Sequence, residues 1–337
     1  MRLSICIPTY NRGKFLGDLF DSILAQQGYS CEIELVVSDN ASTDDTQGVV
    51  ERYRTRFDHT VYDRAAQNMG ADRNYLRIVE IATGDWCWLM GSDDILEPGA
   101  IARVEATITA HPDIAGISVG RTIRSFTLEK RHEELLSKGL RLDNSGMITG
   151  VDAAFQNLAA YFAYLSGQIV RRSLWQNAVR SSPVGDYYNA YVHVYVIGRM
   201  LLRCPHWYYL AEALVGWREG NDSFLSEGAY NRLRIDVVGY EELACGLFGK
   251  ASPTYHHISA DIATGLLFQR LLEGRINSAP LSFFSAAAKL VVPRYWRYPG
   301  FWLKTAPLLF LPSAILRLVR WVSHRLRPKP LSDAVLD

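Results

Sequence analysis

The sequence of 337 residues has few cysteines and no long apolar run. Its five cysteines are scattered and form no C-x-x-C pair, which argues against a disulfide framework and against a zinc knuckle. No stretch of ~18 uninterrupted apolar residues occurs, so an ordinary transmembrane helix is not expected. The first apolar run ends at Pro8 and is too short for a signal peptide. These absences predict a cytosolic chain with reduced thiols.

Two nucleotide-binding signatures are also missing. The sequence contains neither G-x-G-x-x-G after its first apolar run nor G-x-x-x-x-G-K-[ST]. This disfavours a dinucleotide-dependent oxidoreductase and a P-loop ATPase. An apolar fraction of 48% and a charged fraction of 21% allow a sizeable core, which excludes a mostly disordered protein.

Acidic residues are missing from a long C-terminal stretch. None occurs between Glu273 and Asp333, so residues 274–337 carry a net charge of +8 while residues 1–273 carry −7. Within this stretch, Ser313–Arg327 places aliphatic residues on one helical face and basic residues on the other, as in helices that lie in a membrane interface. Packing on the protein's own core or on another subunit is the alternative. Nucleic acid is disfavoured because the segment is too apolar and has no recognition motif.

Strand and helix patterns alternate over the first hundred residues. Apolar runs at Leu3–Ile7, Ile33–Val37 and Trp86–Met90 predict strands, helical spacing between them predicts helices, and another helix is expected to begin near Pro98. This alternation predicts an α/β fold with a mostly parallel sheet covered on both faces. Ligands of such sheets bind beyond the carboxyl ends of the strands. That rule selects three polar segments, namely Pro8–Arg12, Ser38–Ser42 and Gly91–Asp94.

Carboxylates stand at two of these strand ends. Asp93 and Asp94 are adjacent, and adjacent carboxylates repel each other unless a cation or hydrogen-bond donors lie between them. Mg²⁺ and Mn²⁺ are commonly held by one or two carboxylates together with substrate phosphates, and such an ion stabilises a departing diphosphate. The alternative is that one of the pair only caps the next helix. Asp39 taken alone is ordinary turn chemistry.

Five segments with these features follow one another in a fixed order. They are Ile5–Arg12, Leu35–Asp44, Asn68–Asn74, Gly84–Asp85 and Ser92–Asp94. This order resembles the inverting glycosyltransferases of family 2, which have the Rossmann-like GT-A fold. Within that family it is most similar to the abequosyltransferase-type enzymes of O-antigen assembly. The resemblance is strong over residues 1–100 and weaker from about residue 150 to 225.

The resemblance implies a donor site for a nucleotide-diphosphate sugar. Asp39 would accept a hydrogen bond from the nucleobase, Asp93 would bind the ribose or the sugar, and Asp94 would hold Mn²⁺ or Mg²⁺. Many relatives carry a further Asp where this chain has Gly91, which implies weaker metal binding. The remaining implied donor residues lie in the nucleoside pocket or face the diphosphate or sugar, and are Pro8, Thr9, Tyr10, Arg73 and Asn74.

The residues implied for the general base and for completing the metal site depart from the family pattern. An inverting transfer needs a base for the acceptor hydroxyl. Val192-His193 stands where the family has Glu-Asp, so His193 is the implied base and Asp186 its rival. His193 could instead be a buried member of an aromatic cluster. Glu219, where relatives often have a His, or Asp222 would complete the metal site, unless this segment is a surface turn.

Three regions are expected. Residues 1–222 form the GT-A domain, with a nucleotide-sugar-binding half (1–100) and an acceptor half (101–222). Residues 223–279 form a helical segment, and residues 280–337 form a basic, amphipathic, membrane-associating tail.

The expected function is metal-dependent transfer of a sugar, such as a deoxyhexose, to a polyprenyl-diphosphate-linked oligosaccharide in O-antigen-like lipopolysaccharide assembly. The enzyme would be peripheral at the cytoplasmic face of the bacterial inner membrane, bound to its anionic surface. A polysaccharide synthase is disfavoured because Q-x-x-R-W is absent. A catalytically silent nucleotide-sugar-binding scaffold in an assembly complex is the alternative.

Overall fold

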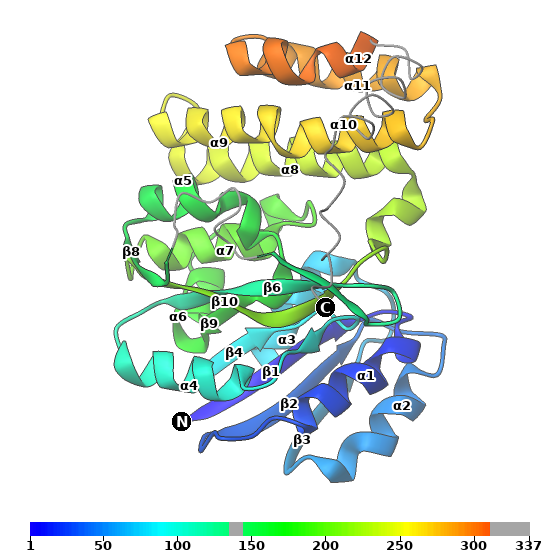
Figure 1. Cartoon of the computed structure of the whole chain (residues 1–337). Helices are drawn as coiled ribbons and strands as arrows, with labels where there is room; N and C mark the ends of the chain where they lie inside the picture. Colours follow the sequence, from blue (N-terminus) through cyan, green and yellow to red (C-terminus); the bar gives the residue numbers. More distant parts are fainter. Residues whose placement is uncertain (135–143, 311–337) are drawn as a thin grey trace, which may run out of the picture. The chain divides into compact units, whose positions relative to one another are not determined.

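The computed structural model describes residues 1–134 and 144–310 (Figure 1). The chain divides into two compact units, one of residues 1–223 and 238–258, the other of residues 224–237 and 259–337. The first unit contains a ten-stranded sheet. The described residues of the second unit form helices and turns. Two helices, α8 (Ala229–Phe248) and α9 (Pro253–Thr264), contribute residues to both units.

The main path of the sheet has the order β3-β2-β1-β4-β9-β6-β10-β5, with β7 added to β6 and β8 added to β10. The strands in chain order are β1 (Arg2–Thr9), β2 (Glu32–Asp39), β3 (His59–Arg64), β4 (Trp86–Leu89), β5 (Ile95–Leu96), β6 (Gly116–Arg124), β7 (Lys130–Glu134), β8 (Gly146–Thr149), β9 (Gln168–Arg171) and β10 (His206–Arg218).

Helices cover both faces of this sheet (Figure 1). The helices α1 and α2 pack against each other, and α3, α6 and α7 pack together in another layer. The helices of the first unit outside α8 and α9 are α1 (Gly13–Leu24), α2 (Thr46–Tyr53), α3 (Ala71–Ile81), α4 (Ala100–Ala110), α5 (Val151–Phe162), α6 (Arg172–Arg180) and α7 (Val192–Leu201). Short helical turns are η1 (Arg54–Arg56), η2 (Leu165–Gly167), η3 (Val184–Tyr187) and η4 (Ser223–Glu227), the last at the border of the two units.

The N-terminal half of the sheet matches the sequence prediction. β3, β2, β1 and β4 are all parallel, and β1 is buried from Leu3 to Thr9. Helix α1 buries Leu16, Leu19 and Ile23, which recur at helical spacing and pack in the same core as β1. The alternation of buried strands with amphipathic helices therefore forms the expected α/β half-sheet.

The second half of the sheet is mixed, so the prediction of a mostly parallel sheet is wrong. β9 runs antiparallel to both β4 and β6, and β5, β7 and β8 are also antiparallel to their partners. Only β6 and β10 form a parallel pair in this half. The reason is that η2 brings the chain to the carboxyl end of β4. The next strand, β9, therefore starts beside the end of β4 and runs in the opposite direction.

The helix expected to begin near Pro98 is α4, which begins two residues later. Pro98 itself lies outside the first turn, after the short strand β5 that pairs with β10. Gly99 caps the helix with a φ of +79°, a conformation that glycine adopts without steric cost. The helix therefore begins at Ala100.

In the second unit, α10 (Leu266–Ile276), α11 (Leu281–Tyr295), η5 (Phe301–Thr305) and α12 (Pro307–Phe310) follow one another. Arg275 is buried and donates to the carbonyl oxygens of Leu308 and Leu309 at 2.7 Å each, which satisfies the end of α12. No helix in residues 1–134 or 144–310 is long and apolar enough to cross a membrane. The predicted amphipathic helix 313–327 lies outside the described residues.

Candidate active site

The carboxyl ends of β1, β2 and β4 meet at one edge of the sheet. The backbone N–H of Asn40 donates to Thr9 O at 2.9 Å, so the chain leaves β1 and β2 side by side. Among the residues predicted for the nucleoside pocket, Pro8 and Thr9 are buried and Tyr10 is exposed. The buried Thr9 hydroxyl has no hydrogen-bond partner. This edge therefore combines an exposed aromatic ring with an unsatisfied polar atom, both suited to a ligand.

Asp39 is buried at the end of β2 and fixed by its neighbours. One carboxylate oxygen accepts from the Ser42 N–H at 2.8 Å, and the other accepts from the Tyr62 hydroxyl at 2.7 Å. The Arg64 guanidinium lies 3.6 Å from the same carboxylate. Burial and the hydrogen bond to Asp39 raise the pKa of Tyr62, so its hydroxyl stays protonated and donates. Asp39 is thus a rigid acceptor at the expected nucleobase position.

Arg73 and Asn74, both predicted to face the diphosphate or the sugar, lie in different surroundings. Asn74 is buried, accepts from the Ser38 hydroxyl at 2.6 Å and donates to Ser38 O at 3.1 Å, so it ties α3 to the end of β2. Arg73 is exposed, with its guanidinium 5.4 Å from the ring of Tyr188. Arg73 is therefore available to a ligand, whereas the Asn74 amide is occupied by the protein.

Asp94 is 3% exposed and accepts three hydrogen bonds. They come from the Tyr164 hydroxyl at 2.9 Å, the Ser166 hydroxyl at 2.5 Å and the Arg218 N–H at 3.1 Å. Burial, with the neighbouring charge of Asp93, raises the pKa of Asp94 to about 7. Ser166 lies in η2 and Tyr164 directly before it, so both donors come from the segment that leads into the antiparallel strand β9.

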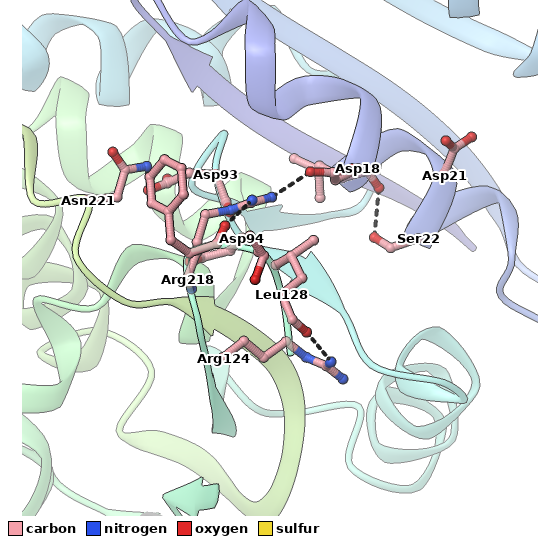
Figure 2. Close-up of polar contacts among 12 residues, drawn as sticks. Asp18, Asp21, Ser22, Asp93, Asp94, Arg124, Leu128, Arg218 and Asn221 are labelled. Atoms are coloured by element: carbon pink, nitrogen blue, oxygen red, sulfur yellow. Dashed lines mark hydrogen bonds and ion pairs between the residues drawn. The ribbon is translucent and has the colours of Figure 1, made fainter. Parts of the chain in front are cut away.

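Asp93 faces two further donors. Its carboxylate accepts from the Asn221 amide at 2.7 Å and forms an ion pair with the Arg12 guanidinium at 3.4 Å. Burial raises the pKa of Asp93, while Arg12 opposes this by favouring the charged form. Figure 2 shows Asp93 and Asn221 side by side. Asp93 is the more accessible carboxylate of the pair.

Arg218, at the end of β10, is buried beside this pair (Figure 2). Its guanidinium donates to Asp93 O at 2.8 Å, to Phe126 O at 2.8 Å and to a carboxylate oxygen of Asp18 at 2.7 Å. It also lies 4.9 Å from the ring of Phe15. A fixed cation next to two carboxylates balances their charge and attracts an anionic ligand such as a diphosphate.

The two residues predicted to complete the metal site, Glu219 and Asp222, follow the end of β10. Across the described ranges, no group of three His, Cys, Asp or Glu side chains is placed to hold a metal ion. The Glu219 N–H instead extends the pairing of β10 with β6 by donating to Arg124 O at 3.0 Å.

The Asp93-Asp94 pair by itself fits a divalent ion that is completed by substrate phosphates. A Cβ built at Gly91 would lie 3.3 Å from a carboxylate oxygen of each aspartate. The Ser166 hydroxyl would be closer still, at 3.1 Å, so a side chain at this position would crowd both carboxylates.

The two predicted bases lie in different surroundings. His193, in the first turn of α7, is 2% exposed, with Nε2 3.4 Å from Ala163 O and Nδ1 without a hydrogen-bond partner. Its ring is edge-on to Tyr75 at 5.3 Å, and burial lowers its pKa to about 4. Asp186, in η3, is exposed. His193 is thus a neutral buried imidazole with a free lone pair, and Asp186 is an accessible carboxylate.

Sequence reasoning missed Asp72, which joins α3 to the start of α7. Its carboxylate accepts from the Ala190 N–H at 2.8 Å and from the Val192 N–H at 3.1 Å. Backbone N–H groups at a helix N-terminus have no acceptor within the helix. Asp72 supplies one and so caps the helix that carries His193. No local sequence pattern predicts this cap, because Asp72 lies more than a hundred residues before the helix that it caps.

Two cationic residues of the site were also given no role. Arg12 could have been found, because it ends the polar segment that follows β1. Arg218 directly precedes Glu219 in the segment predicted to lie near the metal, but its ion pair with Asp18, 200 residues away in the sequence, could not have been found.

Comparisons with known proteins identify the family of this chain. Residues 4–174 match the family described as Glycosyl transferase family 2. The chain is 31% identical over 264 residues to abequosyltransferase RfbV of Salmonella typhimurium, an alignment that covers 74% of this chain and 76% of that protein. It is also 30% identical over 111 residues to poly(ribitol-phosphate) beta-N-acetylglucosaminyltransferase TarS of Staphylococcus aureus, across 19% of that protein.

Solved structures show the same fold. The chain is similar to S. aureus TarS 1-349 in complex with UDP-GlcNAc, with a TM-score of 0.61 and 15% identity, over 96% of this chain and 92% of that one. It is also similar to mannosyltransferase PcManGT from Pyrobaculum calidifontis in complex with GDP-Man and Mn²⁺, with a TM-score of 0.56 and 16% identity, over 94% and 87%. These likenesses support the GT-A fold.

Proposed function

Because the chain belongs to glycosyltransferase family 2, we propose that it transfers one sugar, with inversion, from a nucleoside-diphosphate sugar to a polyprenyl-diphosphate-linked oligosaccharide. The proposed setting is O-antigen-like assembly at the cytoplasmic face of a bacterial inner membrane. The likeness to RfbV over three quarters of the chain supports a deoxyhexose donor, since abequose is a 3,6-dideoxyhexose.

One arrangement supports this proposal most strongly. Asp39 and the Asp93-Asp94 turn end neighbouring parallel strands, where ligands of open α/β sheets bind. Asp39 offers an acceptor to a nucleobase N–H. Arg12 and Arg218 offer positive charge to the diphosphate. A divalent ion, Mn²⁺ or Mg²⁺, held by the aspartate pair would supply Lewis-acid stabilisation of the leaving diphosphate.

The protein's part in the chemistry is to place and deprotonate the acceptor. A base removes the proton of the acceptor hydroxyl, the oxygen bonds to the anomeric carbon, and the bond from that carbon to the diphosphate breaks on the opposite face. We propose His193 as this base, with Asp186 as its rival. The unpaired Nδ1 of His193 supports the first assignment, while its burial and its lowered pKa make it a weak base. The exposure of Asp186 supports the second.

The donor site is tested by thermal shift with UDP, CDP, GDP and dTDP, each with and without Mn²⁺. Binding to the folded state raises the melting temperature by mass action. We expect one nucleotide to stabilise the protein, and Asp39→Ala to abolish that shift while Asp45→Ala, at an exposed carboxylate, leaves it unchanged. A panel without any shift contradicts the proposed donor site.

The base is tested by comparing His193→Ala with Asp186→Ala in the transfer reaction. Loss of the base lowers kcat by roughly 10²- to 10⁴-fold while the donor still binds. We expect this loss for His193→Ala. Near-wild-type turnover of a folded His193→Ala protein, with loss in Asp186→Ala, transfers the role to Asp186.

A silent nucleotide-sugar-binding scaffold is the second candidate. Two observations favour it, namely glycine at position 91 and full hydrogen bonding of the Asp94 carboxylate. Multiple turnover with a donor and an acceptor distinguishes the two candidates.

A further inference from the structure

The second unit exposes an unusual number of large apolar side chains. Six of them are between 46% and 83% exposed and lie in or beside α10, α11, η5 and α12. This set, called the outer face below, consists of Ile276, Leu281, Trp296, Trp302, Leu303 and Phe310. The core of the unit does not need these side chains, because α11 already buries a separate stripe that includes Phe284, Ala287 and Val291. Six exposed apolar side chains within residues 276–310 indicate an interaction surface in this part of the chain.

The outer face is held in place by internal contacts. Thr305 donates to Ala263 O at 2.6 Å, and Arg275 fixes the carbonyl end of α12. The Trp302 indole N–H donates to Trp296 O at 2.9 Å, which sets the two tryptophans next to each other. The exposed side chains therefore belong to folded elements.

Basic side chains predominate around the outer face, with Glu273 as an exposed acid one turn before Ile276 on α10. Lys289, Arg297 and Lys304 are exposed among these apolar residues, and no acidic residue follows Glu273 within the described chain. Arg297 lies 5.3 Å from the ring of Trp296. Tryptophan and basic residues next to aliphatic side chains are the composition that proteins present to the headgroup region of a membrane. Each such cation near an anionic surface adds to the attraction.

We propose that the outer face docks onto an anionic lipid bilayer through the folded helices α11, η5 and α12, in addition to any contact made by residues 311–337. The inference rests on the proposed function, since a lipid-linked acceptor is presented at such a surface. It places the lipid contact on residues that the amphipathic pattern of 313–327 does not include.

The test is sedimentation of the full chain with phosphatidylcholine vesicles, with and without phosphatidylglycerol. Leu303→Glu and Phe310→Glu each place a charge on a side chain that is 83% or 70% exposed, so neither disturbs the core. Leu202→Glu is the matched control, at a leucine that is 50% exposed in the first unit. We expect binding that requires phosphatidylglycerol, a roughly tenfold or greater loss for the two outer-face variants, and no change for the control.

Other occupants of the outer face give different results. If a second copy of the chain covers it, Leu303→Glu dissociates an oligomer in light scattering and leaves vesicle binding intact. If residues 311–337 cover it, Leu303→Glu lowers the melting temperature without vesicles and again leaves vesicle binding intact. Either result overturns the inference, as does a wild-type protein that fails to sediment with anionic vesicles.

The same preparations separate this inference from the proposed function. The thermal shift by a nucleoside diphosphate depends on the first unit, so Leu303→Glu should retain it in full. A retained shift without vesicle binding in the wild type removes the docking surface and leaves the glycosyltransferase proposal standing.

Discussion

Burial controls the charge of the titratable groups at the strand ends. Asp94 has its pKa raised to about 7 by burial and by Asp93, and His193 has its pKa lowered to about 4 by burial. Both shifts favour the neutral form of the side chain. The raised pKa of Asp94 lowers its negative charge near neutral pH, so the cations Arg12 and Arg218 contribute a larger share of the electrostatic potential at the site.

The shifted pKa of His193 predicts how stability depends on pH. The unfolded chain binds a proton at this residue below about pH 6.5, whereas the folded chain does so only below about pH 4. Stability therefore falls as pH decreases from 6.5 to 4, by up to about 3 kcal/mol from this residue. Urea unfolding over this range should show a flatter dependence for His193→Gln than for wild type. Equal slopes for wild type, His193→Gln and the control at exposed His59, His59→Gln, contradict the pKa shift.

Arg12 is expected to recognise phosphate. Its guanidinium pairs with Asp93 at the mouth of the site, and a charged hydrogen bond to a diphosphate contributes roughly 1.5–3 kcal/mol. Arg12→Ala should weaken binding of the preferred nucleoside diphosphate by roughly tenfold to a hundredfold, and binding of the nucleoside much less. Calorimetry with both ligands measures the difference, with exposed Arg52→Ala as the control. An equal loss for both ligands is inconsistent with a phosphate contact.

Among the elements, α7 depends on α3 for its first turn. The Asp72 carboxylate accepts from the Ala190 and Val192 N–H groups, and Ala190 has a φ of +75°. Asp72→Ala leaves buried N–H groups unpaired and should reduce the free energy of unfolding by about 1–2 kcal/mol, with partial recovery in Asp72→Asn. Glu80→Ala, at an exposed position of α3, is the control. The expectation fails if denaturant unfolding finds Asp72→Ala as stable as this control.

Some elements of the fold were predictable from the sequence and others were not. β1, β2 and β4 were predictable because each is a short, buried apolar run that ends in polar residues, and the strand-end rule then located Asp39 and Asp93. The mixed half was not predictable, since the direction of β9 follows from where η2 brings the chain. Partners such as Asp18 and Arg218 meet only after folding, so no local pattern records them.

In the second unit, Asp236 joins α8 to α10. Its buried carboxylate pairs with Arg232 of the same helix and with Arg270 at 2.9 Å. Removal of one partner of a buried ion pair leaves uncompensated charge, so Asp236→Ala should cost about 3–5 kcal/mol of unfolding free energy. Glu273→Ala removes an exposed partner of Arg270 and should cost less than about 1 kcal/mol. Chemical denaturation of both variants makes the comparison, and similar costs would show that burial of Asp236 does not matter.

At the scale of the whole molecule, the proposed chemistry and the proposed docking surface belong to different units. The strand ends, the aspartate pair and both candidate bases lie in residues of the first unit, and the outer face lies in the second. The described part of the basic stretch after Glu273, as far as Phe310, belongs to the second unit. We therefore expect substitutions at the outer face to change access to a lipid-linked acceptor while leaving donor binding intact.

The central claim is that this chain catalyses sugar transfer and does not merely bind a sugar nucleotide. The direct measurement follows transfer from the preferred sugar nucleotide to a polyprenyl-diphosphate-linked oligosaccharide, and counts products per protein molecule. We predict many products per molecule, with inverted anomeric configuration and a loss of transfer in Asp93→Ala. Donor binding without turnover by the wild-type protein would contradict the claim and identify the chain as a scaffold.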